Sequence, residues 1–310
     1  MNTQTTEALV PSLGASTSAE ADVGGADLDP TLRPKRKFPQ PPPLEHHGPA
    51  RVVALCNQKG GVGKTTTAIN LGAALADYGR KVLLIDFDPQ AAATDGLGFR
   101  GRDFEDKSIY SLIIDGRVDA AELVIETPIQ GMDLLPSHIN LSAAELQLVT
   151  EVAREQALER AIKPLLPDYD IALIDCQPSL GMLTINALTA ANSVIIPVEC
   201  EYFALRGVAL LLETIGKVQR RINPDLAVDG VLATRYDGRT VHGKEILERL
   251  IEGFGEQLFD TVVGRTVKFP ETTAGGLPIT TLAPSSPGAK AYRQLAREVL
   301  HRWAMAATTP

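Results

Sequence analysis

The sequence predicts an α/β fold with a doubly wound, mostly parallel sheet flanked by helices. Two observations indicate this fold. Apolar runs of strand length alternate with helical patterns from Arg51 to Trp303, and a glycine-rich loop joins the first apolar run to the first helical pattern. Because ligands of such sheets bind beyond the carboxyl ends of the strands, we expect the functional residues at that edge.

The expected strands are continuous apolar runs, as is typical of parallel strands buried on both faces. They span residues 51–56, 81–86, 132–135, 171–175, 193–198, 228–233 and 258–263. The expected helices carry apolar residues on one face and span residues 65–76, 142–162, 208–222 and 286–303. A capping box, Ser142 with Glu145, opens the second helix, and the pair Ser286 and Pro287 opens the last.

Residues 1–49 differ in composition from the rest of the chain. They are rich in Ser, Thr, Ala, Gly and Pro and include three consecutive prolines. Such a segment buries too little apolar surface to offset its ordering entropy, so we expect a disordered tail (1–49) followed by one folded domain (50–310). The basic cluster of residues 33–37 could contact DNA or acidic lipid, although a solvated linker is the favoured interpretation.

Composition limits the class of protein. Across 310 residues the net charge is −8, so a nucleic-acid partner would require a local basic patch. No apolar run approaches the roughly 18 residues of a membrane span, and the N-terminus lacks the pattern of a secretory signal. Cys56, Cys176 and Cys200 show no CxxC spacing, so we expect buried, reduced thiols in a cytoplasmic protein.

The glycine-rich loop of residues 59–66 predicts a phosphate-binding site of the P-loop NTPase type. Its glycines let successive N–H groups converge on an anion, and the following helix directs its positive end to the same place. Lys64 is placed to reach the β- and γ-phosphates, and the Thr65 hydroxyl can ligate Mg²⁺. The predicted nucleotide-binding residues are Lys59, Gly60, Gly61, Val62, Gly63, Lys64, Thr65 and Thr66.

The loop departs from the strict GxxxxGK[ST] pattern, because Gln58 occupies the position of the first glycine. A lysine followed by two glycines stands there instead, which is the deviant KGGxGK[ST] form with two lysines. Lys59 lies at the other end of the loop from Lys64 and cannot easily fold back onto the same γ-phosphate. This arrangement suggests that Lys59 acts on a neighbouring subunit.

Three carboxylates end predicted strands at the same edge. Asp175 has the position of a Walker-B aspartate, which would hold Mg²⁺ directly or through water. Asp86 and Asp88 are two residues apart on a strand, so we expect both to point the same way, one toward the metal and one toward the attacking water. Alternatively, Asp88 with Pro89 only starts a turn. The predicted catalytic residues are Lys59, Lys64 and Asp88, and the predicted metal ligands are Thr65, Asp88 and Asp175.

Taken together, these motifs resemble the ParA/Soj chromosome-partitioning ATPases of the deviant Walker-A class. The similarity covers about residues 51–303 and is carried by residues 59–66, 86–90, 175–181, 184–188, 199–205 and 264–268. It implies ATP and Mg²⁺ binding, a face-to-face homodimer around two nucleotides, and non-specific DNA binding by that dimer. It also implies slow hydrolysis stimulated by a ParB-like or other segregation partner, and a nucleoid-associated, cytoplasmic location.

The resemblance assigns roles to individual residues. Lys59 matches the lysine that reaches across the dimer, and Asp88 matches the aspartate needed for hydrolysis. The DNA-binding positions match Arg239, Arg265 and Lys268, whose alternative interpretation is ordinary surface charge. Departures from the family pattern at Gln177, Ala91, Ala92 and Arg206 spare the phosphate and metal residues but indicate a paralogue whose partner differs from the standard ParB.

Other members of the wider class provide alternatives. A MinD-like, membrane-associated positioning ATPase would use its last helix as a basic amphipathic anchor. Here that helix is more simply a core-packing element, and we expect no stable membrane association. An iron-protein type of reductase needs exposed cysteines at another spacing. A metabolic ATP-dependent ligase would show turnover that depends on an added small acid.

Overall fold

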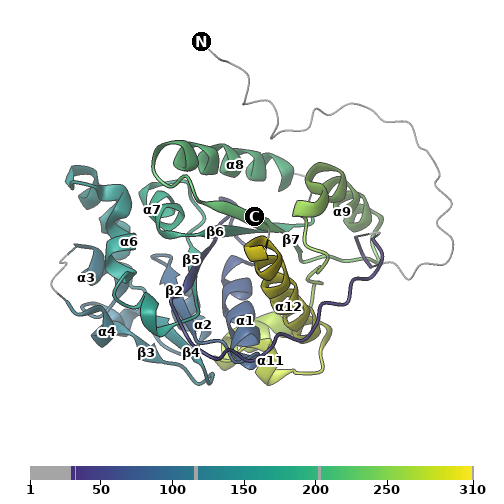
Figure 1. Cartoon of the computed structure of the whole chain (residues 1–310), viewed down its shortest axis with the longest axis horizontal. Coiled ribbons are helices and arrows are strands. Elements are labelled where there is room, and N and C mark those ends of the chain that lie inside the picture. Colours follow the sequence, from purple (N-terminus) through teal and green to yellow (C-terminus); the bar gives the residue numbers. More distant parts are fainter. Residues whose placement is uncertain (1–28, 32, 115–117, 202–203, 309–310) are drawn as a thin grey trace, which may run out of the picture.

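The computed structural model describes residues 29–31, 33–114, 118–201 and 204–308. Within these residues a seven-stranded sheet has the order β3-β4-β2-β5-β1-β6-β7, and every neighbouring pair is parallel except β3 and β4 (Figure 1). The predicted fold class is therefore confirmed. The strands are β1 (Arg51–Leu55), β2 (Val82–Phe87), β3 (Ile125–Glu126), β4 (Met132–Leu135), β5 (Ile171–Cys176), β6 (Ser193–Glu199) and β7 (Ala227–Thr234).

Helices cover both faces of the sheet, each over its own hydrophobic core. One core packs α3, α5, α6, α7, α8 and α9, and the other packs α1, α2, α11 and α12, so the sheet is doubly wound. The helices are α1 (Lys64–Asp77), α2 (Ala92–Gly96), α3 (Ile109–Ile114), α4 (Ala120–Leu123), α5 (Leu141–Gln147), α6 (Ala157–Ile162), α7 (Met182–Ala190), α8 (Ala204–Arg221), α9 (Val241–Phe254), α10 (Lys268–Gly275), α11 (Ile279–Leu282) and α12 (Pro287–Thr308).

Strand register brings the predicted site residues together. Leu55 of β1 pairs with Asp175 of β5, and Asp86 of β2 pairs with the same residue. The glycine-rich loop follows β1 and leads into α1. The loop and the three carboxylates therefore lie at the carboxyl edge of adjacent strands, as the sequence predicts.

The single helix predicted over residues 142–162 is wrong. Ser142 lies inside α5 and does not cap it, since Asn140 is the residue before the helix. The helical path then breaks, because Glu151 is extended and Ala153 adopts a left-handed φ of 52°. Asn186 of α7 explains the break: its amide donates to the Arg154 carbonyl (2.9 Å) and accepts from the Leu158 N–H (3.1 Å). A tertiary partner thus replaces the helical hydrogen bonds.

The strand predicted over residues 258–263 is also wrong. The N–H groups of Phe259 and Val263 donate to β7 at 2.9 Å each, so the segment meets the sheet at separate points and does not form a strand along it. Between these points the N–H groups of Asp260 and Thr261 donate to the carboxylate of Glu298 on α12, at 2.9 and 3.0 Å. A fully buried side chain thereby takes the place of a strand partner.

Residues 29–31 and 33–49 form a strap that runs past α12 to the start of β1 (Figure 1). Arg33 pairs with Asp260 at 2.8 Å, Arg36 pairs with Glu256 at 3.2 Å, and His47 contacts Asp170 at 2.8 Å. The solvated-linker interpretation of residues 33–37 is therefore wrong for both arginines, because acidic residues far along the chain bind them. Residues 1–28 of the expected tail lie outside the described residues.

Two further expectations agree with the structure. Cys56, Cys176 and Cys200 are free and buried. Helix α12 begins at Pro287 and buries Ala289, Tyr292, Leu295, Ala296 and Val299, so it is the predicted core-packing helix. Among the helices that the structure describes, none is long and apolar enough to cross a membrane.

Candidate nucleotide-binding site

The glycine-rich loop has the backbone that its residue types predict. Gly61 and Gly63 adopt left-handed φ angles of 76° and 87°, and Gly63 is the residue before α1. A side chain would be strained at both positions. Val62 is buried beneath the loop, where its carbonyl accepts a hydrogen bond from Thr234 of β7 at 2.8 Å. The loop is therefore held open above the end of the sheet with the start of α1 directed at it.

An open cavity of about 720 Å³ lies over this loop. Its volume falls in the usual range for a small-molecule site, about 300–1,000 Å³. Many of the predicted residues line it, namely Gly60, Gly61, Gly63, Lys64, Thr65, Thr66, Asp88, Arg239 and Arg265. Lys64 is the first residue of α1 and is buried, with its ammonium donating to the Lys59 carbonyl at 3.2 Å.

Asp175 lies behind the loop and not on the cavity surface. It is fully buried, and among the described residues neither of its carboxylate oxygens has a partner in good hydrogen-bond geometry, although Thr65 and Lys64 lie near enough to lower its pKa. Burial first, and the neighbouring Asp86 second, raise the pKa of Asp175 well above its usual value. An unpartnered buried carboxylate at this place fits a cation, because a divalent ion would supply the missing partner.

The protein would supply few ligands to a metal ion at this site. In the part of the chain that the structure describes, no group of three or more His, Cys, Asp or Glu side chains is arranged to hold a metal ion. Mg²⁺ typically binds through one or two protein oxygens, several waters and the phosphates of its nucleotide. Thr65, Asp88 and Asp175 fit that pattern, since two of them line the cavity and the third lies buried close by.

Asp86 and Asp88 lie close together where β2 ends, since the Asp88 N–H donates to Asp86 Oδ1 at 3.3 Å, but their carboxylates have different surroundings. Asp86 is fully buried and accepts from the N–H and the hydroxyl of Thr94, at 2.8 and 2.7 Å. Burial is the main cause that raises the pKa of Asp86 to about 7. Asp88 instead lines the cavity and also accepts from the Gln90 N–H at 2.9 Å, so the turn interpretation holds as well.

Lys59 points away from the cavity into an acidic cluster. Its ammonium lies 3.1 Å from Glu199 and 2.6 Å from Glu201, at the end of β6. The other oxygen of Glu199 pairs with Arg235 at 2.7 Å. The two lysines of the loop therefore have separate surroundings in one subunit, one beneath the cavity and one beside it. Part of the family-like motif at this place, Tyr202 and Phe203, lies outside the described residues.

Two of the three predicted DNA-binding residues, Arg239 and Arg265, line the cavity, and Lys268 follows the lining residue Val267 in the chain. Arg239 is 89% exposed and pairs with Asp237 at 2.8 Å, and its hydrogen bonds lower the pKa of Asp237 to about 2. Lys268 pairs with Glu271 at 2.9 Å, while Arg265 lines the cavity. Exposed ion pairs of this kind contribute little stability, so a phosphate could replace the carboxylate partner.

Sequence reasoning missed the wall of the cavity that faces the loop. Val263, Val267, Phe269, Pro270 and Tyr292 form an apolar surface there. With phosphates at the loop, this surface suits the base of a nucleotide. The available signal was the group Val267, Phe269 and Pro270, which stands shortly after the last expected strand. Arg235, which also lines the cavity, has a left-handed φ of 52°.

The departures from the family pattern lie close to the site. Gln177 donates to Glu145 of α5 at 2.8 Å, which ties the end of β5 to that helix. Ala91 adopts a left-handed φ of 52°, and Ala92 lines the cavity. Arg206 is exposed on α8. These residues leave the phosphate loop and the carboxylates in place.

Comparison with known proteins agrees with this geometry. Residues 50–228 match the family described as an AAA domain. The chain is 56% identical to the uncharacterized protein Rv1708 of Mycobacterium tuberculosis, over 91% of this chain and 88% of that protein. It is 45% identical to the sporulation initiation inhibitor protein Soj of Bacillus subtilis, over 80% of this chain and 98% of Soj.

A solved structure provides a third comparison. It is described as cobyrinic acid a,c-diamide synthase from Mycobacterium smegmatis with bound ADP and magnesium. It has a TM-score of 0.73 and 41% identity, and the match covers 84% of this chain and 98% of that one. The similarity therefore extends over nearly the whole described domain.

Proposed function

This chain belongs to the ParA/Soj family of partitioning ATPases, and from that premise we propose that it is an ATP-dependent dimerising ATPase that binds DNA non-specifically. In this proposal it acts in chromosome partitioning and hydrolyses ATP to ADP and phosphate under the control of a partner protein. One observation carries the proposal. The loop has two lysines, and Lys64 lies beneath the cavity whereas Lys59 is turned outward to Glu199 and Glu201.

The nucleotide would be ATP with Mg²⁺. The ADP and magnesium named for the Mycobacterium smegmatis structure support this assignment. Thr65, Asp88 and Asp175 are the residues that would hold the ion, and when bound it would neutralise charge on the β- and γ-phosphates. Residues 60–66 would bind the phosphates through backbone N–H groups and Lys64.

Asp88 would orient the attacking water, since its carboxylate lines the cavity at the end of β2. Lys59 would serve the phosphates of a second subunit, because in its own subunit it points away from them. Dimerisation would therefore complete both sites at once. Release of Lys59 from its two carboxylates is the step that this arrangement requires.

DNA binding would follow dimerisation. Arg239 and Arg265 line the cavity, Lys268 follows the lining residue Val267 in the chain, and a dimer would double the number of cations that reach phosphate. The logarithm of affinity should then fall with the logarithm of salt concentration by roughly 0.9 per phosphate neutralised. Since the net charge of the chain is −8, binding without this local patch would be unfavourable. A nucleoid-associated location follows from the same proposal.

Binding to random-sequence DNA, measured with ATP, with ADP and without nucleotide, tests the proposal. We expect salt-sensitive binding with ATP only, and weaker binding after Arg239→Glu or Lys268→Glu. Lys217→Glu, on an exposed ion pair with Glu213, is the matched charge-reversal control and should bind more nearly as wild type does. Equal DNA affinity with and without ATP would count against the proposal, as would wild-type affinity in both Arg239→Glu and Lys268→Glu.

The roles of the loop residues can be separated by measuring the molar mass in ATP. Asp88→Ala should accumulate as an ATP-bound dimer because hydrolysis is blocked. Lys59→Ala should stay monomeric because the contact across the dimer is lost. A monomeric Asp88→Ala protein at saturating ATP would contradict this division of roles.

Two alternative functions, a membrane-associated role and a ligase role, can each be compared with a specific observation. A MinD-like membrane role would need an apolar helix face at the surface, yet α12 buries its apolar side against α1. Sedimentation with liposomes in ATP and without DNA would reveal such a role. The name of the Mycobacterium smegmatis structure favours a ligase as second candidate. ATP turnover that depends on added cobyrinic acid would support it.

A further inference from the structure

The strap begins with a compact turn that fixes the backbone of Arg33. The N–H and the hydroxyl of Thr31 both donate to Asp29 Oδ1, at 2.7 and 2.6 Å, and the Asp29 N–H donates to the Arg33 carbonyl at 2.9 Å. Asp29 and Thr31 are both buried. The turn is therefore part of the packed structure and presents Arg33 in one direction.

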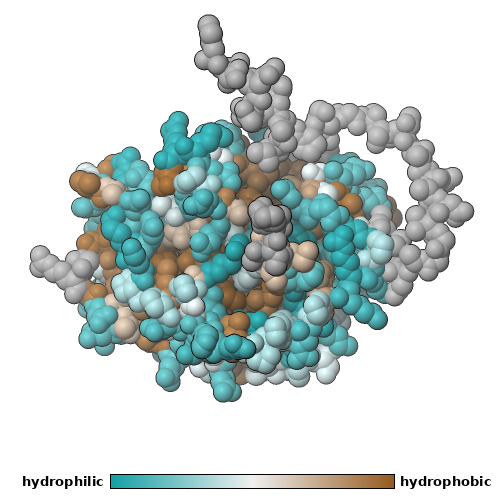
Figure 2. Space-filling model, in the orientation of Figure 1, coloured by the Kyte–Doolittle hydropathy of each residue, from teal (hydrophilic) through white to brown (hydrophobic). Residues whose placement is uncertain are grey.

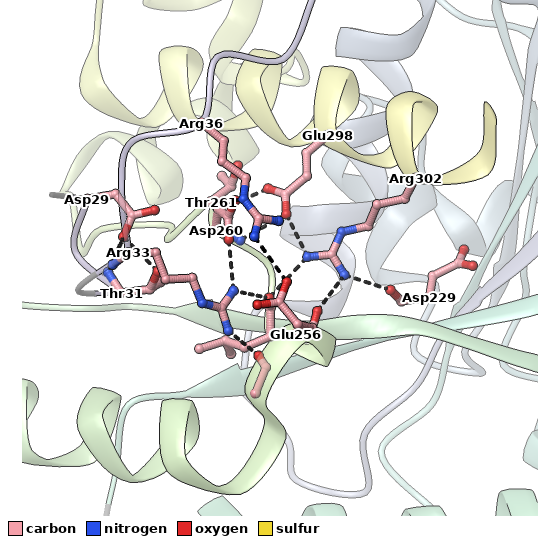
Figure 3. A network of polar contacts seen from close by, with 12 residues as sticks. Asp29, Thr31, Arg33, Arg36, Asp229, Glu256, Asp260, Thr261, Glu298 and Arg302 are labelled. Atoms are coloured by element: carbon pink, nitrogen blue, oxygen red, sulfur yellow. Dashed lines mark hydrogen bonds and ion pairs between the residues drawn. The ribbon is translucent and has the colours of Figure 1, made fainter. Parts of the chain in front are cut away.

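Arg33 reaches an edge segment, residues 255–263, that follows α9 (Figure 3). Its guanidinium donates to the carbonyls of Gly255 and Leu258 and pairs with Asp260 at 2.8 Å. The Asp260 side chain is only 1% exposed, so this pair is largely shielded from water. Arg36 adds weaker contacts to Asp260 and Glu256, and the Asp260 charge is the main cause that raises its pKa. Hydrophilic residues predominate on this side of the molecule (Figure 2).

Helix α12 holds the same segment from the other side. Glu298 accepts from the N–H groups of Asp260 and Thr261, and Arg302 donates to the carbonyls of Glu256 and Leu258. The guanidinium of Arg302 also lies 4.3 Å from the centre of the Phe259 ring. Side chains from two distant parts of the chain thus satisfy backbone groups that a neighbouring strand would otherwise satisfy.

Two physical connections lead from this network to the nucleotide cavity. The edge segment ends at Val263, which lines the cavity, and the chain then leads to Val267, Phe269 and Pro270 of the apolar wall. Along α12, Tyr292 lies six residues before Glu298; its hydroxyl is 3.2 Å from Thr67 of α1, and its ring meets Phe269 edge-on at 5.9 Å. The network and the apolar wall are therefore parts of one packed unit.

We propose that the strap positions the apolar wall of the nucleotide cavity, and that Arg33 is its main positioning residue. Arg33 touches no part of the cavity. It acts by holding the edge segment, and through it the wall that would contact the base. The phosphate loop lies at the other end of the cavity and does not depend on the strap. Removal of Arg33 should therefore weaken contacts to the nucleoside more than contacts to the phosphates.

Competition binding to the full-length protein tests this inference with two probes, ADP and inorganic tripolyphosphate. We expect Arg33→Ala to weaken ADP binding by roughly threefold to tenfold, the usual size of coupling through packed networks, with a smaller change for tripolyphosphate. The KM for ATP should rise while kcat stays nearly constant. Arg33→Lys should recover only part of the affinity, since an ammonium cannot match the fork of a guanidinium. Lys37→Ala, an exposed change on the same strap, is the control.

Hydrogen exchange provides an independent measurement. Arg33→Ala should speed exchange in residues 255–270 and leave residues 59–66 unchanged. Equal loss of ADP and tripolyphosphate affinity, or wild-type affinity for both in a folded Arg33→Ala protein, would overturn the inference. If Arg33→Ala does not fold, Arg36→Ala replaces it in the experiment. The contacts of Arg36 are more exposed, so its removal should also weaken ADP binding more than tripolyphosphate binding, but by a smaller factor. None of these measurements involves DNA, so they remain decisive if the proposed function fails.

Discussion

The phosphate loop lines the cavity and the edge segment reaches it at Val263, yet the two are specified in different ways. The loop is fixed by its own residue types, with left-handed glycines and a helix that begins at its last glycine. The edge segment is fixed by Arg33, which lies 225 residues from Leu258 in sequence, and by Glu298, 38 residues from Asp260. Local patterns therefore predict the loop, whereas the edge segment depends on contacts that no local pattern contains.

The largest expected effect tests the loop. Lys64→Ala should lower ATP turnover at least about 100-fold, the size found when one preorganised charge is removed from a transition state. The free energy of unfolding should change less than turnover does, because the hydrogen-bond partner of the Lys64 ammonium is a loop carbonyl. Turnover at saturating ATP and urea unfolding are the measurements. A large loss of stability in Lys64→Ala would show that the loop, too, depends on tertiary support.

The edge segment should respond in the opposite way. Glu298→Gln removes a fully buried charge that binds Arg302 and two backbone N–H groups, so we expect a loss of about 3 kcal/mol in the free energy of unfolding. The kcat of the folded protein should stay close to that of wild type. Glu213→Gln, which breaks an exposed pair with Lys217, is the control and should leave the free energy of unfolding nearly unchanged. A similar loss of unfolding free energy in Glu298→Gln and Glu213→Gln would contradict the idea that burial makes the Glu298 contacts important for stability.

The same contrast explains how much the sequence predicts. The order of strands and helices, Asp175 at the end of β5 and the loop itself follow from periodicity and glycine spacing, which are local properties. The failures occur at residues 148–156 and 258–263, where Asn186 and Glu298 bind backbone groups that the patterns assigned to a helix and a strand. The strap could not be predicted, because its composition is that of a linker and its partners are acidic residues more than 200 positions away.

A third prediction concerns the carboxyl edge and depends on pH. Burial raises the pKa of Asp86 from 3.8 to about 7, so between these values the native state binds more protons at this site than the unfolded state does. The stability contributed by Asp86 is therefore complete at low pH and is lost as pH rises toward 7. Asp86→Asn removes this dependence. The free energy of unfolding of Asp86→Asn, relative to that of wild type, should rise by about 2 kcal/mol between pH 5 and pH 7.

Urea unfolding at several pH values measures this difference. Asp103→Asn, at an exposed carboxylate, is the control and should leave the pH profile of wild type unchanged. A constant difference between Asp86→Asn and wild type across this range would mean that Asp86 is ionised throughout. In that case the hydrogen bonds from Thr94 would outweigh burial.

The smallest expected effect is on stability, when an alanine with a left-handed backbone is replaced by glycine. Two such alanines can be compared. Ala91 lies beside the cavity and Ala153 lies in the break between α5 and α6, and both have a φ of 52°. Glycine relieves a left-handed strain of about 1–2 kcal/mol but adds about 0.5–1 kcal/mol of unfolded-state entropy. Ala153 is exposed, so Ala153→Gly should stabilise the protein by about 0.5 kcal/mol.

Ala91 is only 5% exposed, so Ala91→Gly also loses the burial of a methyl group, worth about 0.8 kcal/mol. We therefore expect almost no change for Ala91→Gly in urea unfolding. Equal gains in stability in the two variants would show that backbone strain alone determines the change in the free energy of unfolding. The buried methyl group of Ala91 would then contribute nothing to stability.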